Sequence, residues 1–215
     1  MSGAEPEVAL DRTELPMFPL GSVLLPTMLL PLHVFEDRYR VMIERVLDGD
    51  GTFGVTMIER GSEVGGNDVR ATVGCRARIL EAEQQADGRW HLVAVGTERI
   101  AVDEWLPDDP YPRALVSSSP DTLPADIVDG DGWLELFGAF HELMSLIEQV
   151  SGEAVPRVTL ADDPELATFQ MAAVAPLGAL DRHRVLCGEH AGVRRTTLLD
   201  AFEHLTVLVN DATTN

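Results

Sequence analysis

Two groups of residues in this sequence have side chains and spacings that could support metal chemistry. His141 and Glu142 begin like the helical HExxH motif, in which two His at i and i+4 bind zinc and the Glu acts as a base. Ser145 stands where the second His is needed. We therefore interpret His141 as a polar residue at the edge of an amphipathic helix.

His183, Cys187 and His190 form the second group, because spacings of i, i+4 and i+7 would place three metal-compatible ligands on one helical face. Only three ligands are evident, whereas a structural zinc site has four. The favoured interpretation is that Cys187 packs in the core and the two His flank it. The sequence leaves metal binding at these three residues open, and we expect no cofactor.

The tetrapeptide Asp-Gly-Asp-Gly occurs at 48–51 and again at 129–132, and it resembles the start of a calcium-binding loop. An EF-hand continues with Asp or Asn at position 5 and Gly at position 6. The first copy continues with Thr52-Phe53 and the second with Trp133-Leu134. We interpret both copies as residues that end or begin helices.

The sequence contains no lysine, and all 16 basic residues are Arg. A Walker A phosphate loop, a Schiff-base enzyme, a Ser-Lys dyad and a kinase each need a Lys. There is also no G-x-S-x-G motif, and neither Cys lies in an electropositive stretch. We expect that the chain is not an enzyme and has no catalytic, cofactor-binding or metal-binding residues.

The charge of the chain limits its partners. Thirty-six acidic residues give a net charge of -20 over 215 residues. Nucleic acids and anionic membranes bind clustered cations, so neither partner is expected. The charge is uneven, because residues 103–165 hold 15 Asp or Glu and two Arg. The rest of the chain is much closer to neutral.

Two features bear on the location of the protein. Cys75 and Cys187 are far apart and show no paired spacing, and the acidic N-terminus lacks the order of a signal peptide. Both favour a cytoplasmic protein. Residues 15–35 carry no Asp, Glu or Arg, but four Pro interrupt them, so short buried strands are expected there and not a membrane span.

The hydrophobic pattern predicts strands first and helices later. Between Glu36 and Asp48 the apolar residues follow a helical period, and between Val73 and Ile79 they alternate as in a half-buried strand. Asp87-Gly88 predicts a hairpin, and Gly96 is expected to end a strand. Further strands are predicted at 17–20, 23–25, 28–32, 52–59, 90–95, 100–105 and 113–118.

Beyond residue 118 the pattern changes to helices. They are predicted at 133–150 with Asp131 as N-cap, at 163–175, at 177–190 and at 194–210. The predicted organisation is a disordered tail at 1–13, a β-rich lobe at 14–118, an acidic linker at 119–132 and a helical lobe at 133–211. The fold class is α+β.

Several motifs resemble one known family, the N-terminal substrate-binding domain of Lon protease. The most specific is PLHVFEDRYR at 31–40, followed in the same order by FGV at 53–55, VGCRARI at 73–79, DGRWHLVAVGTERI at 87–100 and PYPRALV at 110–116. PLGALDRHRVL at 176–186 matches more loosely. The resemblance covers about residues 15–209 and implies a PUA-like β pseudo-barrel followed by a helical bundle.

The resemblance also implies a function. In Lon this domain helps to recognise unfolded or damaged substrates, whereas the ATPase and the Ser-Lys peptidase lie in later domains. The residues that match the family motifs are expected to be mainly structural, and Cys75 stands where the family leads us to expect a Thr-like residue. These matching residues are Pro31, Glu36, Arg38, Tyr39, Arg40, Gly96 and Arg99.

The leading hypothesis is a non-catalytic module that binds peptides or unfolded segments of other proteins, with a separate protease as a further possible partner. Candidate contacts come from the apolar segment at 15–35, although core packing is favoured for most of them: Met17, Phe18, Met28, Leu30 and Phe35.

Two alternatives remain. One is RNA binding through a basic face on the β lobe, which net charge opposes. That face would comprise Arg76, Arg78, Arg89 and Arg99. The other is a small-molecule enzyme whose site is a spatial constellation.

Overall fold

The computed structural model describes residues 12–60, 69–123, 129–155 and 157–214. Residues 1–11 of the predicted tail at 1–13 lie outside these ranges, whereas Thr13 belongs to the first strand. The elements in chain order are β1 (Thr13–Leu20), β2 (Leu29–Val34), α1 (Asp37–Asp48), β3 (Thr52–Arg60), β4 (Val69–Gln84), β5 (Trp90–Leu106), β6 (Arg113–Ser118), α2 (Gly130–Ser151), α3 (Pro164–Val174), α4 (Ala179–Cys187) and α5 (Ala191–Thr214).

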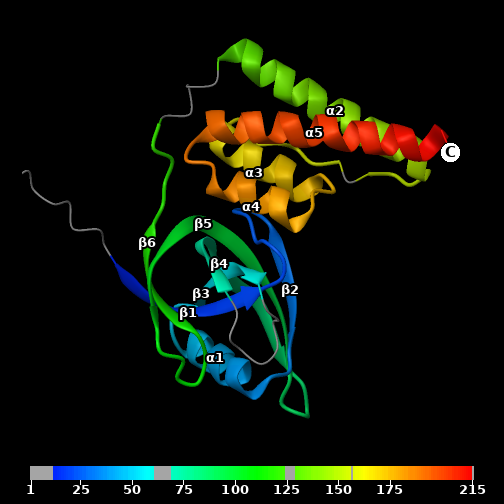
Figure 1. Cartoon of the computed structure of the whole chain (residues 1–215). Helices are drawn as coiled ribbons and strands as arrows, with labels where there is room; N and C mark the ends of the chain where they lie inside the picture. Colours follow the sequence, from blue (N-terminus) through cyan, green and yellow to red (C-terminus); the bar gives the residue numbers. More distant parts are fainter. Residues whose placement is uncertain (1–11, 61–68, 124–128, 156, 215) are drawn as a thin grey trace, which may run out of the picture.

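The strands form a closed barrel with one extra strand. Their order is β2-β5-β4-β3-β1-β6, and β6 pairs again with β5. The long strand β5 makes this possible, because Trp90–Val95 pairs with β2 while Ile100–Leu106 pairs with β6. β1 and β3 are parallel and the other pairs are antiparallel. The fold is α+β, as the sequence predicts, and Figure 1 shows the barrel between α1 and the four later helices.

Helix α1 packs on the barrel through the apolar stripe that its period predicts. Tyr39, Met42, Ile43 and Val46 are buried, and they join a core cluster with side chains from all strands except β6. The ring of Tyr39 stacks on Phe18 with 4.2 Å between centroids. This helix therefore covers the side of the barrel that carries Phe18 of β1.

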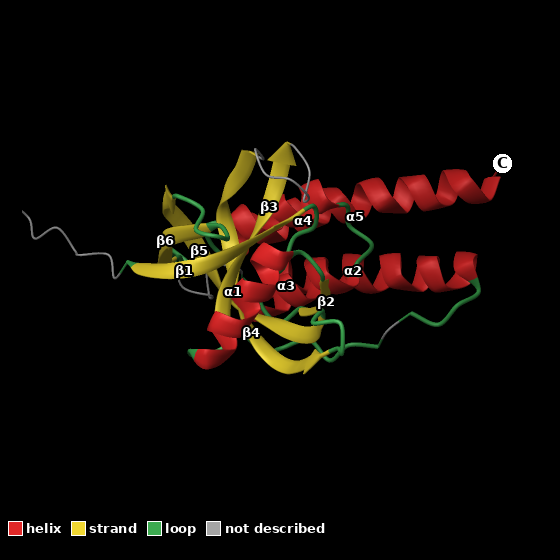
Figure 2. Cartoon of the chain, turned by 90° about the horizontal axis from the view of Figure 1, so that it is seen from below, coloured by secondary structure: helices red, strands yellow, loops and turns green. Residues whose placement is uncertain are grey.

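The helical lobe shares a hydrophobic core with the other end of the barrel. Leu25 and Met57 from the β lobe pack in one cluster with Phe140 of α2 and Phe202 of α5, whose rings lie 5.8 Å apart. Figure 2 shows α2 and α5 extending beyond the barrel. The division into lobes at 14–118 and 133–211 remains a prediction, but the shared core predicts that the two parts stabilise each other.

Two strand predictions are wrong near Gly96. β5 runs through Gly96 without a break, and the β4–β5 register shifts beside it, which marks a bulge. Residues 23–25 are buried but irregular. The cause is one close crossing: a Cβ at Gly96 would lie 2.2 Å from the carbonyl oxygen of Leu25. Gly96 also exchanges backbone hydrogen bonds with Thr27 and Met28 at 2.8 and 2.9 Å.

The helix boundaries correct the sequence in smaller ways. The N-cap of α2 is Asp129 and not Asp131, because the Asp129 carboxylate accepts a hydrogen bond from the Gly132 amide at 2.7 Å. Asp163 is the N-cap of α3, and its carboxylate accepts a hydrogen bond from the Glu165 amide at 3.0 Å. The helix predicted at 177–190 is shorter, since α4 ends at Cys187. In the part of the chain that is described, no helix is long and apolar enough to cross a membrane.

Candidate functional site

The five residues predicted to contact a peptide do not form one surface. Met17 has no exposed area, and Phe18 and Leu30 are at most 9% exposed, so these three are core residues. Met28 is half-buried against two core clusters. Only Phe35 is open to solvent, at 54% exposure. Met17 and Phe18 are neighbours on β1 that face opposite sides, and each packs in a different core cluster, so both sides of this strand are covered.

The residues of the 31–40 motif build the joint between β2 and α1. Arg38 donates to the Glu36 carboxylate at 3.1 Å and lies over the ring of Tyr39 at 4.5 Å. Arg40 pairs with Asp37 at 3.0 Å and lies close to Gly88 at the β4–β5 turn, where a Cβ would contact its guanidinium. These contacts favour the structural role that the resemblance implies.

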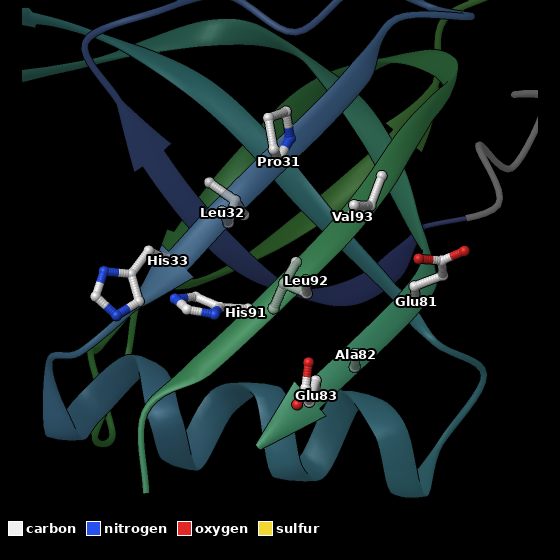
Figure 3. A pocket seen from close by; sticks show the side chains of 9 residues that line it. All are labelled: Pro31, Leu32, His33, Glu81, Ala82, Glu83, His91, Leu92 and Val93. Atoms are coloured by element: carbon white, nitrogen blue, oxygen red, sulfur yellow. The ribbon is translucent and has the colours of Figure 1, made fainter. Parts of the chain in front are cut away.

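Three adjacent strands beside this joint form an open groove on the outer face of the sheet (Figure 3). Two cross-strand rows define it: Pro31 pairs with Val93 and His33 with His91, and the next strand adds Glu81 and Glu83 to the same rows. The groove holds about 590 Å³. We name it the β2–β5–β4 groove, and its lining residues are Pro31, Leu32, His33, Glu81, Ala82, Glu83, His91, Leu92 and Val93.

The strand period explains why this face is open. Leu30, Val34, Leu92 and Ala94 point to the opposite face and are buried in the core with α1. Because successive side chains of a strand alternate, their neighbours must face solvent. No residue of a described helix lines the groove, and Figure 3 shows α1 below it and behind the end of β4.

The polar side chains of the groove lie on two sides. The rings of His33 and His91 are 4.5 Å apart, and Glu81 and Glu83 lie along β4. All four side chains are exposed. Within the described ranges, no three His, Cys, Asp or Glu are grouped so that they could hold a metal ion. Acid–base groups gain most of their strength where water is excluded, so this exposed arrangement favours binding over catalysis.

An apolar stripe extends the groove along β2. Leu29 is 57% exposed and lies on the same outer face of β2 as Pro31 and His33, and Phe35, the first residue after β2, is 54% exposed. The Phe35 ring lies 6.1 Å from His33 and borders a small pocket of about 130 Å³ that shares Leu32 and His33 with the groove. The groove therefore continues past His33 to Phe35, and Leu29 is exposed beyond Pro31 at its other end.

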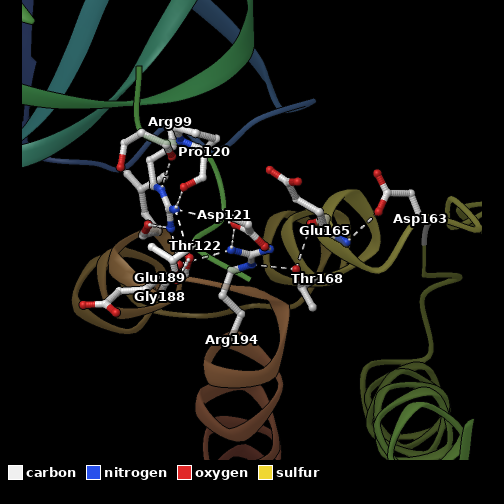
Figure 4. A network of polar contacts seen from close by, with 12 residues as sticks. Arg99, Pro120, Asp121, Thr122, Asp163, Glu165, Thr168, Gly188, Glu189 and Arg194 are labelled. Carbon is white, nitrogen blue, oxygen red and sulfur yellow. Dashed lines mark hydrogen bonds and ion pairs between the residues drawn. The ribbon is translucent and has the colours of Figure 1, made fainter. Parts of the chain in front are cut away.

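A second polar cluster joins the two lobes (Figure 4). Arg99 of β5 is 6% exposed and donates to the carbonyl oxygens of Ser119 at 2.8 Å and Pro120 at 3.0 Å. It also donates to Gly188 in the helical lobe. Burial, and then the charge of Arg194, lower the pKa of Arg99 from its ordinary value. This contact pattern makes Arg99 a structural residue.

Arg194 of α5 completes the cluster and was missed by the sequence analysis. It has no exposed area, and it binds both oxygens of Asp121 at 2.6 and 2.7 Å. It also donates to Thr168 at 2.8 Å and lies over the Phe169 ring at 4.4 Å. Asp121 lies in the predicted acidic linker, and nothing in the local sequence distinguishes it from the other acidic residues there.

The metal hypothesis at His183, Cys187 and His190 rests on a helix that does not continue. α4 ends at Cys187 and Gly188 follows, so His190 does not share the helical face. Cys187 is exposed and not in the core as expected, and its Sγ lies 3.6 Å from Nε2 of His183. The three side chains therefore do not form the predicted ligand row.

Three of the four Arg in the basic-face hypothesis are already paired with an acid or buried. Arg76 pairs with Glu98 and Arg89 with Asp87, while Arg99 is buried in the joint. They do not form a contiguous unpaired basic face. These contacts among the described residues therefore do not favour RNA binding.

The fold and its open groove define a class of protein: a small β-barrel with a helical lobe that presents an uncovered outer sheet face. A family model described as the ATP-dependent protease La (LON) substrate-binding domain matches residues 14–201. The chain belongs to this family, as the sequence motifs indicated.

Individual relatives agree with this assignment. The chain is 26% identical over 182 residues to Lon protease 2 of Herpetosiphon aurantiacus, which covers 83% of this chain and 22% of that protein. It is 28% identical over 120 residues to a LON peptidase N-terminal domain and RING finger protein of Schizosaccharomyces pombe, covering 50% of this chain and 24% of that protein. The chain spans only about a fifth to a quarter of the length of these curated relatives.

Solved structures show the same fold. The Lon N-terminal domain protein from Xanthomonas campestris superposes with a TM-score of 0.62 at 26% identity, over 87% of this chain and 98% of that one. The N-terminal domain of a Mycobacterium avium complex Lon protease gives a TM-score of 0.58 at 17% identity, over 89% and 98% of the two chains.

Proposed function

We propose that this chain is a non-catalytic recognition module that binds exposed segments of other proteins, and that the β2–β5–β4 groove is the binding surface. The observation that carries the proposal is an open, partly apolar groove with the exposed side chains of Leu29 and Phe35 near the two ends of its β2 side. Large apolar side chains grouped on one exposed surface are typical of interaction sites. The family description as a substrate-binding domain supports the same function.

The proposal needs no enzymatic step. The domain family contributes recognition, and the sequence lacks the Lys that the ATPase and the Ser-Lys peptidase require. A cytoplasmic client, or a separate protease that receives it, would be a partner of this module.

Binding of a carboxymethylated, permanently unfolded model protein tests the function. Fluorescence anisotropy of the labelled model protein should give a Kd of about 10 to 100 µM, a range typical of weak recognition. The double variant L29S/F35S should weaken binding at least fivefold, because it removes apolar area without changing the core.

The matched control is L134S/L180S, which removes two exposed Leu from α2 and α4, at 70% and 68% exposure. It should bind like the unchanged protein. Absence of binding by the unchanged protein, or equal loss in both double variants, would contradict the proposal.

A further inference from the structure

The β2–β5–β4 groove is chemically asymmetric from one strand to the next. On its β2 side the exposed apolar side chains of Leu29 and Phe35 flank Pro31 and His33, and its β4 side carries the carboxylates of Glu81 and Glu83. β5 lies between them and contributes Val93 and His91. A ligand that crosses the strands therefore meets an apolar region and then an acidic one.

The two carboxylates have no partner of their own. Among the described residues, neither the Glu81 nor the Glu83 side chain makes an ion pair or a hydrogen bond, unlike Glu98, which pairs with Arg76. Arg78 lies one cross-strand row further along β4, opposite Val95, and does not line the groove. The lining thus carries two acids and no Arg.

The free edge of β2 is a poorer docking surface for a peptide than the outer face of the sheet. β2 pairs only with β5 in the described sheet, so its other edge is open. Pro31, in the middle of this strand, has no N–H to donate, and such a residue interrupts strand addition. Recognition of side chains on the outer face of the sheet is therefore the binding mode that remains.

We propose that the groove selects segments in which an aromatic or aliphatic residue is followed or preceded by Arg or Lys two to four residues away. The apolar side chain would pack on the β2 stripe and the cation would pair with Glu81 or Glu83. The spacing follows from geometry: β2 and β4 are two strand spacings apart, about 10 Å, and an extended segment rises about 3.3 Å per residue. This inference rests on the proposed function and names its substrate class.

The test uses three labelled 12-residue peptides with the same apolar residue at their centre. Three residues away from this centre, the first peptide has Arg, the second Ser and the third Glu. At about 50 mM salt the Arg peptide should bind the full chain at least fivefold more tightly than the Ser peptide, and the Glu peptide most weakly. Raising the salt to about 500 mM should reduce this preference, because exposed charges are screened. A longer peptide in which nine residues separate the apolar centre from Arg should lose most of the gain in affinity over the Ser peptide.

The double variant E81Q/E83Q should bind the Ser peptide normally and lose the preference for Arg. The control E142Q/E203Q changes two exposed carboxylates of the helical lobe by the same charge and should keep the preference. If the preference survives E81Q/E83Q, or falls equally in the control, it reflects the net charge of -20 and the inference is wrong. Equal binding of all three peptides rejects the inference but leaves the proposed function, whereas no binding of any peptide rejects both.

Discussion

Arg194 is the largest side chain with almost no exposed area among the described residues, and its charge is balanced by an acid 73 positions earlier. Removing one partner of a buried ion pair leaves an uncompensated charge, which costs much more than removing both. The pair with Asp121 is bidentate, and Arg99 lies 3.5 Å from the same carboxylate. The joint between the lobes therefore depends on a few side chains.

Replacing Arg194 with Met should lower the free energy of unfolding by about 3–5 kcal/mol. Chemical denaturation followed by circular dichroism measures this change. The double variant D121N/R194M should recover part of the loss, because no unpaired carboxylate remains. Arg184→Met removes an exposed pair with Asp181 and should cost at most about 1 kcal/mol. A similar loss in R184M and R194M would contradict the role of burial.

Cys75 gives a pH-dependent prediction. It has no exposed area, and burial raises the pKa of its thiol to about 12. The thiolate is the reactive form, so only Cys187 should react with a disulfide reagent in the folded protein at pH 8. Burial raises the pKa of Cys187 as well, so its reaction should be slow for an exposed thiol. Two rapidly reacting thiols without denaturant would be inconsistent with this structure.

The raised pKa of Cys75 also affects stability at alkaline pH. The folded state holds the proton more tightly than the unfolded state, so this contribution is complete below the unfolded value of about 9. It should be lost as the pH rises toward 12. In Cys75→Ser the free energy of unfolding should fall less steeply over this window than in the unchanged protein, as measured by urea denaturation at several pH values.

At the scale of elements, the crossing of residues 25–28 over β5 decides how the barrel meets the helices. Gly96→Ala would place a Cβ 2.2 Å from a backbone oxygen, which cannot move as a side chain can. We expect a loss of about 1–3 kcal/mol in the free energy of unfolding, as for other overpacked sites. Thermal and urea denaturation measure it.

The control for this variant is Gly138→Ala, in the middle of α2, where a Cβ would meet no atom within 4 Å. It should stabilise the protein by about 0.5–1 kcal/mol, because Ala favours the helix more than Gly does. If both variants had the same sign, the close approach at Gly96 would not be the deciding contact.

At the scale of the whole molecule, the shared core predicts that barrel and helices unfold together. Trp133 lies at the start of α2, so in Trp133→Phe the fluorescence reports Trp90 and Trp105 of the barrel only, while circular dichroism at 222 nm reports mainly the helices. The two transitions should coincide. Two separate midpoints would show that the lobes are independent.

A substitution in the shared core tests the same prediction, that the barrel and the helices unfold together. In Phe140→Ala the two transitions should still coincide, and the free energy of unfolding should be lower by about 3–5 kcal/mol, because Phe140 packs against Phe202 in the cluster that also holds Leu25 and Met57. Leu134→Ala, at a site 70% exposed on the same helix, should change stability by about 0.5 kcal/mol or less. A loss confined to the helical signal would argue against a common core.

The sequence by itself determined the α+β class, the helix period at residues 37–48, the strand at Arg113–Ser118 and the family. These are local properties, because period, turn residues and motifs are written along the chain. It also predicted that most of segment 15–35 is core, although it could not say which side chains would be exposed.

Tertiary structure alone decided the groove and the joint. Pro31, His91 and Glu81 lie on three strands, and only the cross-strand register places them in adjoining rows. Asp121 and Arg194 are also brought together only by the tertiary structure, because burial and pairing of distant residues depend on packing and not on sequence distance. A strand slipped by one residue would turn the groove side chains into the core, so the register decides the surface that this protein presents.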